Sequence, residues 1–207
     1  MKKLIKILAA VVLACVTVLS SVACGDSGDA IDNDPEIPVA GDSKILVAYF
    51  SWSGNTRQLA NMIAEKSGGE MFRIVPEEAY ASDFNGCADR AQTELRNGTR
   101  PPLSSHIDKD VMAEYDVIFI GFPIWWYDLL MPVWTFLEEY DLSGKTIIPF
   151  FSHNGSSSGA SSISTVKRLC PDSTVADDYL SVRGSSVSDA ESQVTEWINK
   201  LGIKTEE

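Results

Sequence analysis

Short runs of apolar residues, separated by polar and turn-forming segments, recur along the chain from residue 44 onward. The first run, residues 44–50, shows no polar alternation before Ser51, which predicts a strand covered on both faces. Strands of this kind are typical of parallel sheets. Further strands are predicted at residues 71–75, 117–122, 146–151 and 179–182.

Amphipathic helices are predicted between these strands. Residues 132–140 carry apolar side chains at positions i, i+3, i+4 and i+7, which form one helical face. The last helix is expected to begin with a capping box of Ser188 and Glu191, and other helices are predicted at residues 56–66 and 83–97. This alternation predicts an α/β fold with a doubly wound, five-stranded parallel sheet, in which ligands bind at the carboxyl ends of the strands.

Composition supports one folded domain, placed at residues 44–207. The 207 residues are 44% hydrophobic, which is enough for a sizeable core. They include 29 acidic and 17 basic residues, for a formal net charge of −12. A chain of this charge does not bind phosphate backbones by bulk electrostatics, so nucleic acid is not an expected partner.

The amino terminus has the features of an export signal. Three lysines precede an apolar run at residues 7–19, and small residues follow it up to Cys24. This pattern predicts a signal peptide over residues 1–23. It resembles a bacterial lipoprotein signal, in which the cysteine after the cleavage point carries lipid. Ser21 departs from that family, which usually has a branched aliphatic residue there.

Residues 24–43 are rich in Asp, Gly, Pro and Ser and have few bulky apolar residues, so they predict a solvated acidic tether. The expected location is the bacterial cell envelope, with Cys24 lipidated and the domain anchored to a membrane. The alternative is a simple secretory signal with a coincidental cysteine. Outside the cytoplasm, Cys87 and Cys170 are permitted to form a disulfide, but free buried thiols are the preferred interpretation.

The first of three loops with candidate chemistry follows the first strand, at residues 51–56. It offers hydroxyl groups and the free backbone N–H groups of a helix start, which suit a phosphate. The loop contains no lysine, so a nucleoside triphosphate with magnesium is disfavoured. An ordinary N-cap and turn is the alternative. The candidate residues are Ser51, Trp52, Ser53, Gly54, Asn55 and Thr56.

The second loop, residues 121–128, and the third loop, residues 152–159, also follow strands. The second carries three consecutive aromatic residues, which favour stacking on a flat ligand or, alternatively, a hydrophobic plug over the core. The third contains small residues whose backbone can approach a ring edge, or it is a turn without function. The candidates are Pro123, Ile124, Trp125, Trp126 and Tyr127 in the second loop and Ser152, His153, Asn154 and Gly155 in the third.

Together the three loops resemble those of the flavodoxin family, and the resemblance spans residues 44–202. It implies that the first loop binds the phosphate of FMN and that the third contacts the flavin pyrimidine edge. It also implies that Trp125 stacks on the isoalloxazine, with Trp126 or Tyr127 as alternates. The Pro-Ile-Trp-Trp sequence points to the NAD(P)H:quinone-type branch. The export signal is a departure, because flavodoxins are typically cytoplasmic.

The expected function is that of an exported, FMN-binding oxidoreductase or electron-transfer protein. The flavin would carry the chemistry, so no catalytic side chain and no metal ligand is predicted. The expected partners are FMN, a membrane, and an unidentified donor and acceptor such as NAD(P)H, a quinone or a redox protein. The alternative is a module that binds FMN or another phosphorylated aromatic without redox turnover. Arg90, Arg96 and Arg100 are expected to pair with local acids.

Overall fold

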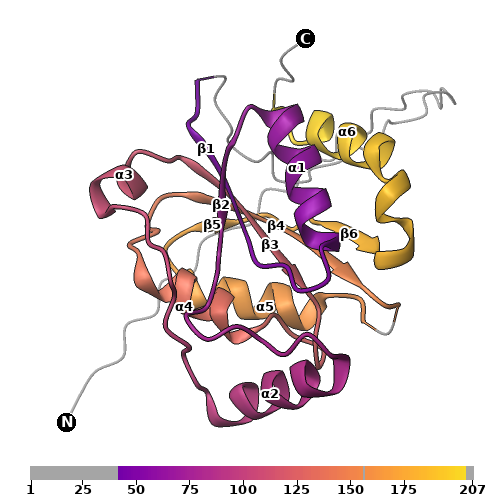
Figure 1. The fold of residues 1–207 in the computed structure, drawn as a ribbon. Coiled ribbons are helices and arrows are strands. Elements are labelled where there is room, and N and C mark those ends of the chain that lie inside the picture. The colour runs from indigo at the N-terminus through magenta and orange to yellow at the C-terminus, as the bar shows by residue number, and fades with distance from the viewer. Residues whose placement is uncertain (1–41, 156, 204–207) are drawn as a thin grey trace, which may run out of the picture. The chain divides into compact units, whose positions relative to one another are not determined.

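The computed structural model of the chain describes residues 42–155 and 157–203. Strands in this part form one parallel sheet in the order β2-β1-β3-β4-β5, and β6 also pairs with β4 (Figure 1). This is the doubly wound order, whose ligand crevice lies at the β1/β3 switch point. The strands are β1 (Ile45–Tyr49), β2 (Glu70–Arg73), β3 (Val117–Pro123), β4 (Thr146–His153), β5 (Thr174–Val175) and β6 (Leu180–Arg183).

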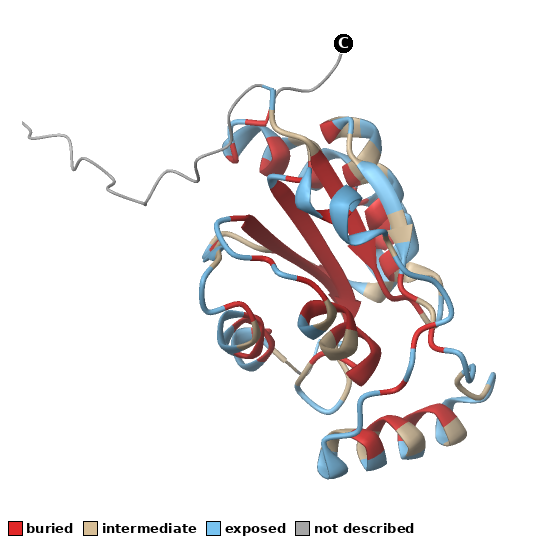
Figure 2. Ribbon diagram, turned by 90° about the vertical axis from the view of Figure 1, so that its left-hand side faces the viewer, coloured by how far each residue is buried: buried red, intermediate tan, exposed pale blue. Residues whose placement is uncertain are grey.

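Alternate residues of the central strands enter two separate cores. Leu46 and Ala48 of β1 pack into one core, whereas Val47 and Tyr49 pack into the other. This alternation follows from the twofold period of a strand, and both of its faces are apolar because helices cover both sides. Figure 2 shows the central strands as buried throughout, with the helices exposed on their outer sides.

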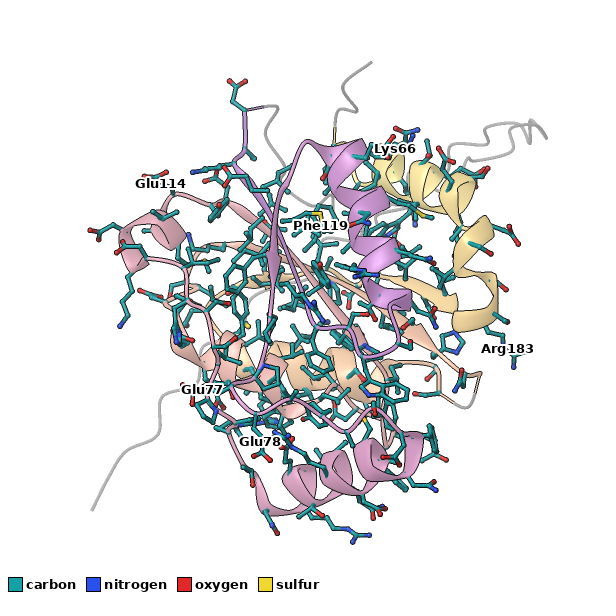
Figure 3. The ribbon with its side chains drawn as sticks, in the orientation of Figure 1. Lys66, Glu77, Glu78, Glu114, Phe119 and Arg183 are labelled. Carbon is teal, nitrogen blue, oxygen red and sulfur yellow. The ribbon has the colours of Figure 1, made fainter. Side chains whose placement is uncertain are left out.

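Helices α1 and α6 cover one face of the sheet, and α4 and α5 cover the other (Figure 1). Phe119 of β3 lies in the α1 and α6 core, where its ring centroid is 5.6 Å from that of Trp197 (Figure 3). The helices are α1 (Asn55–Ser67), α2 (Phe84–Asn97), α3 (Lys109–Ala113), α4 (Met131–Glu139), α5 (Ala160–Leu169) and α6 (Glu191–Lys200), with the 3₁₀ helix η1 (Gly184–Asp189) before α6.

The predicted fold class is confirmed, with one difference at the sheet edge. The predicted strand at residues 179–182 corresponds to β6, but β5 precedes it and pairs with the start of β4. The fifth position of the sheet is therefore shared by two short strands. Each contacts a different part of β4, which is long enough to pair with both.

The predicted capping box of α6 is wrong. Ser188 lies inside η1, and the N-cap of α6 is Ala190, which has no side-chain cap hydrogen bond. The Ala190 N–H instead donates to the Val187 carbonyl at 3.2 Å. Both Val187 and Ala190 are buried, so apolar packing against the core determines where this helix begins.

Several predictions about the amino terminus lie outside the described residues. They concern the signal at residues 1–23, Cys24 and nearly all of the tether at residues 24–43. Among the residues that the structure does describe, no helix is both long enough and apolar enough to cross a membrane. Cys87 and Cys170 are buried free thiols, and burial raises the pKa of each to about 11.

Candidate functional site

A pocket of about 570 Å³ lies where β1, β3 and β4 end. All three predicted loops contribute to its wall, and α2 supplies a fourth side. Its volume is in the usual range of cofactor and small-molecule sites, about 300–1,000 Å³. The lining residues are Trp52, Ser53 and Asn55 from the first loop, Pro123, Ile124, Trp125, Trp126 and Tyr127 from the second, Ser152, His153 and Asn154 from the third, and Phe84, Asn85, Ala88 and Asp89 from α2.

Ser51 and Thr56, two of the predicted site residues, shape the loops without lining the pocket. The Ser51 hydroxyl accepts a hydrogen bond from the Gly54 N–H at 3.2 Å. The Thr56 and Ser152 hydroxyls are 3.0 Å apart and both residues are buried, so this bond joins the first and third loops. Ser53 is therefore the hydroxyl-bearing residue of the first loop that reaches the pocket wall.

The first loop turns sharply into α1 at Gly54. This residue has φ +98°, a left-handed conformation that glycine adopts without steric penalty, and α1 begins at the next residue, Asn55. The first N–H groups of a helix have no partner within the helix and carry its positive dipole end. The Asn55 end of α1 is thus suited to an anionic group at the pocket.

Arg57 adds a positive charge beside Gly54, close to this end of the pocket, and it was not among the predicted site residues. Its Nη2 atom lies 3.9 Å from the position that a Cβ would take on Gly54. The side chain is exposed, and it forms no ion pair with any of the described residues. Arg57 could have been identified from its position in the first turn of α1, one residue after the loop.

Aromatic side chains from different elements pack together beside the second loop. The Trp125 ring meets Trp52 edge to face at 5.4 Å and lies at 32° to Phe84, also at 5.4 Å. Trp125 is half-buried and packs against the core, whereas Trp126 and Tyr127 are 44% and 62% exposed. The predicted stacking residue Trp125 and its two alternates thus differ clearly in their surroundings.

The second loop contains a tight turn in a conformation that is unusual for large side chains. The N–H and carbonyl groups of Trp125 and Asp128 exchange two hydrogen bonds of 3.0 Å. The central residues Trp126 and Tyr127 have φ +52° and +67°, where Asn-Gly is normally preferred. A residue other than glycine raises the conformational free energy of the chain by about 1–2 kcal/mol when its backbone is left-handed. Such residues concentrate at functional sites.

Side-chain hydrogen bonds hold this turn in place. The Asp128 carboxylate accepts from the Leu129 N–H at 2.8 Å and from the Thr165 hydroxyl at 3.0 Å. Burial raises the pKa of Asp128, and these two bonds oppose that rise. The Trp126 indole N–H donates to the Ala88 carbonyl at 2.9 Å, which fastens the turn to α2.

The third loop brings His153 and Arg183 together. His153 Nδ1 accepts a hydrogen bond from the Gly155 N–H at 2.8 Å. Arg183 stands opposite His153 in the parallel pairing of β6 with β4, and its Nη2 atom is 3.5 Å from the Asn154 carbonyl oxygen. Figure 3 shows Arg183 at the end of β6, and a Cβ on Gly155 would lie only 2.1 Å from its Nη2 atom. The guanidinium therefore covers the loop.

The expectation for the other arginines is confirmed at two positions. Arg90 pairs with Glu94 at 2.7 Å, and Arg100 forms two hydrogen bonds with Glu138, at 2.5 and 2.8 Å. Arg96 forms no ion pair with a described residue, so the expectation is wrong there. In residues 42–155 and 157–203, no group of three or more His, Cys, Asp or Glu side chains is placed to hold a metal ion.

The model of the flavodoxin family matches residues 44–201, which include the whole sheet and all three loops. The chain belongs to the flavodoxin family. No functionally curated protein matches it. The family assignment accounts for the parallel sheet and for the pocket at the ends of β1, β3 and β4.

Solved structures of other flavodoxin-like proteins resemble this one over nearly their whole length. A candidate flavoprotein from Bacteroides eggerthii is 33% identical, with a TM-score of 0.66, 79% of this chain covered and 100% of the other. A candidate flavoprotein from Bacteroides uniformis is 34% identical, with a TM-score of 0.65 and coverages of 76% and 98%. A Lactobacillus acidophilus flavoprotein, solved in complex with FMN, is 25% identical, with a TM-score of 0.54 and coverages of 72% and 99%.

The residues of this flavodoxin pocket fit a flavin mononucleotide. The left-handed Gly54 and the start of α1 provide backbone donors for a phosphate, and Arg57 provides a counter-charge. The indoles of Trp52 and Trp125 provide flat apolar surface a short distance away. The pocket thus combines an anion-binding end with an aromatic end.

Proposed function

We propose that this flavodoxin-family protein binds FMN and transfers electrons through it. The observation that carries the proposal is the convergence of all three loops on one pocket with an anion-binding end and an aromatic end. The family assignment and the FMN complex of the Lactobacillus acidophilus relative support it. Bound FMN supplies hydride or electron transfer, so the protein needs no nucleophile of its own.

Each loop has a distinct part in this proposal. The first loop and the start of α1 hold the phosphate, with Ser53 and the backbone N–H groups after Gly54 as donors. Trp125 supplies the stacking surface, supported by its contacts with Trp52 and Phe84. Residues 152–155 contact the pyrimidine edge of the ring.

We further propose that the protein is an exported oxidoreductase of the NAD(P)H:quinone type, attached to a membrane through lipid on Cys24. The basic and apolar pattern of residues 1–23 supports export, and the Pro-Ile-Trp-Trp sequence of the second loop supports the enzyme class. Labelling of cells with a radioactive fatty acid tests the anchor. Labelled protein that loses its label in the Cys24→Ala variant is the expected result, and unlabelled wild-type protein contradicts the anchor.

The visible absorption spectrum tests cofactor binding directly. A chain without residues 1–24 retains the whole region that matches the family model. We expect this protein to retain FMN, with shifted absorption bands, after excess cofactor is removed. Folded protein that retains no FMN at micromolar concentration contradicts the proposal.

Steady-state assays then separate an enzyme from a carrier or a binding module. Turnover with NAD(P)H and a soluble quinone is expected for the oxidoreductase. Reduction and reoxidation only by redox proteins would indicate a carrier, and stable FMN binding without either reaction would indicate a binding module.

A further inference from the structure

The third loop fixes which nitrogen of His153 carries its proton. A neutral imidazole has one donor nitrogen and one acceptor nitrogen. Because the Gly155 N–H donates to Nδ1 at 2.8 Å, Nδ1 is the acceptor and the proton of the neutral ring lies on Nε2. His153 also lines the pocket, and its Nε2–H has no acceptor among the described residues. This leaves a hydrogen-bond donor at the pocket wall without a protein partner.

Arg183 acts on the same ring from the neighbouring strand. It is the charged side chain of β6 that stands opposite His153, and its guanidinium covers Gly155. Burial and then the positive charge of Arg183 lower the pKa of His153, so the ring is neutral near pH 7. Asp89 of α2 and Tyr127 of the second loop are the other titratable groups in the wall of this pocket. Neither is hydrogen-bonded to His153.

We propose that His153 and Arg183 together bind the reduced form of the cofactor more tightly than the oxidised form. This inference rests on the proposed binding of FMN. His153 would donate its Nε2–H to an oxygen or nitrogen of the flavin pyrimidine edge. Arg183 would act as a positioning residue, holding the loop over that edge and adding positive charge.

Charge balance explains why this arrangement favours the reduced cofactor. Addition of two electrons and one proton to a neutral isoalloxazine leaves one negative charge on the ring, and in the test dithionite supplies the electrons. Hydrogen bonds to charged acceptors are roughly twice as strong as those to neutral ones. A donor such as Nε2–H therefore gains binding strength when the ring is reduced, and a cation such as Arg183 does as well.

Potentiometric titration of the FMN-loaded protein is the main test. We expect His153→Phe to weaken binding of reduced FMN about tenfold more than binding of oxidised FMN, which lowers the two-electron midpoint potential by about 30 mV. His153→Gln keeps an N–H donor and is expected to recover part of this loss. Arg183→Gln is expected to lower the potential by a smaller amount. His106→Phe is the matched control, because His106 pairs with Glu139 and does not line the pocket.

Nitrogen-15 NMR of the cofactor-free protein tests the histidine without any activity. The chain has only two histidines, so the His106→Phe variant assigns both signals. We expect Nδ1 of His153 to have the shift of an unprotonated nitrogen and Nε2 that of a protonated one. In Arg183→Gln the pKa of His153 is expected to rise, because a nearby positive charge has been removed.

The possible outcomes are distinct. Wild-type protein that retains no FMN refutes the proposed function together with this inference. Retained FMN with the same midpoint potential in wild type and His153→Phe refutes this inference alone. A proton on Nδ1 in the NMR spectrum also refutes it, because the Nε2 donor would then be absent.

Discussion

At the amino ends of the strands, charged groups are bound by carboxylates or carbonyls of the protein, whereas at the carboxyl ends two arginines lack a carboxylate partner. Lys44 pairs with Glu114 at 2.8 Å and with Glu70 at 3.8 Å, and Lys145 donates to two backbone carbonyls. At the opposite edge, Arg57 and Arg183 pair with no carboxylate of the described residues. The charged groups at the amino edge are therefore bound within the protein, whereas the arginines at the carboxyl edge are available to a ligand.

The two edges should therefore respond differently to mutation. Changes at the amino edge remove contacts that exist without a ligand, so they should lower the free energy of unfolding. At the pocket edge, changing an exposed charge such as Arg57 removes contacts that form only with a ligand, so it should lower affinity with little loss of stability.

The largest effect is expected for Lys145→Met. Lys145 is buried, and its ammonium group donates to the Ala113 and Tyr115 carbonyls at 3.1 and 2.5 Å. The substitution leaves these carbonyls without that donor, so we expect the free energy of unfolding to fall by about 3 kcal/mol in urea denaturation. Lys109→Met, at an exposed position, is the control and should change it by less than about 0.5 kcal/mol. Equal stabilities of the two variants would contradict the comparison.

Trp125→Ala should weaken FMN binding by about 10- to 100-fold, because aromatic stacking contributes about 1–3 kcal/mol per ring. Fluorescence titration with FMN measures the dissociation constant. Trp134→Ala is the matched control, since Trp134 is half-buried on α4 and does not line the pocket. A larger loss in Trp126→Ala or Tyr127→Ala than in Trp125→Ala would move the stacking surface to one of those residues.

Arg57→Gln tests the counter-charge at the phosphate end. We expect the dissociation constant for FMN to rise about fivefold, while that for riboflavin, which has no phosphate, stays the same. The affinity for FMN should also depend less on salt concentration than in the wild type. Arg96→Gln, an exposed position on α2, should change none of these quantities. An equal loss for FMN and riboflavin would show that Arg57 acts on the fold and not on the phosphate.

Tyr115→Phe should change the alkaline stability slightly. Burial and the bond from the Tyr115 hydroxyl to Glu70 raise the pKa of Tyr115 to about 12, from an ordinary value of 10. Between these values the folded protein holds a proton that the unfolded chain has lost, so stability falls as the pH rises from about 10 to about 12. Denaturation at several pH values should show a smaller fall in the variant, by less than about 1 kcal/mol. An unchanged slope would mean that other groups control this range.

The sequence predicted best those elements whose burial is complete. β3 and β4 are continuous apolar runs, and their predicted ends differ from the observed ends by no more than two residues. Helix α5 was not predicted, because serine and threonine occupy much of it and its apolar side chains are few. The split between β5 and β6 was also not visible, since it depends on which parts of β4 remain available for pairing.

The candidate site was also predicted only in part. The three loops follow strong strand signals, so their residues could be placed at one edge of the sheet. The places of Phe84 and Arg183 could not be predicted, because they follow from tertiary packing. Phe84 reaches the pocket through the orientation of α2, and Arg183 faces His153 through the register of β6 against β4. No local pattern in the sequence specifies either arrangement.

The direction of β1 has a consequence for any attachment at the amino terminus. The chain enters this strand at the amino edge of the sheet and leaves it at the pocket, about 17 Å further along for five extended residues. An anchor of the kind proposed above would therefore join the domain at the edge of the sheet opposite the pocket. Attachment at that end would leave the pocket mouth uncovered, so the anchor itself would not block a donor or acceptor that approaches the proposed cofactor site.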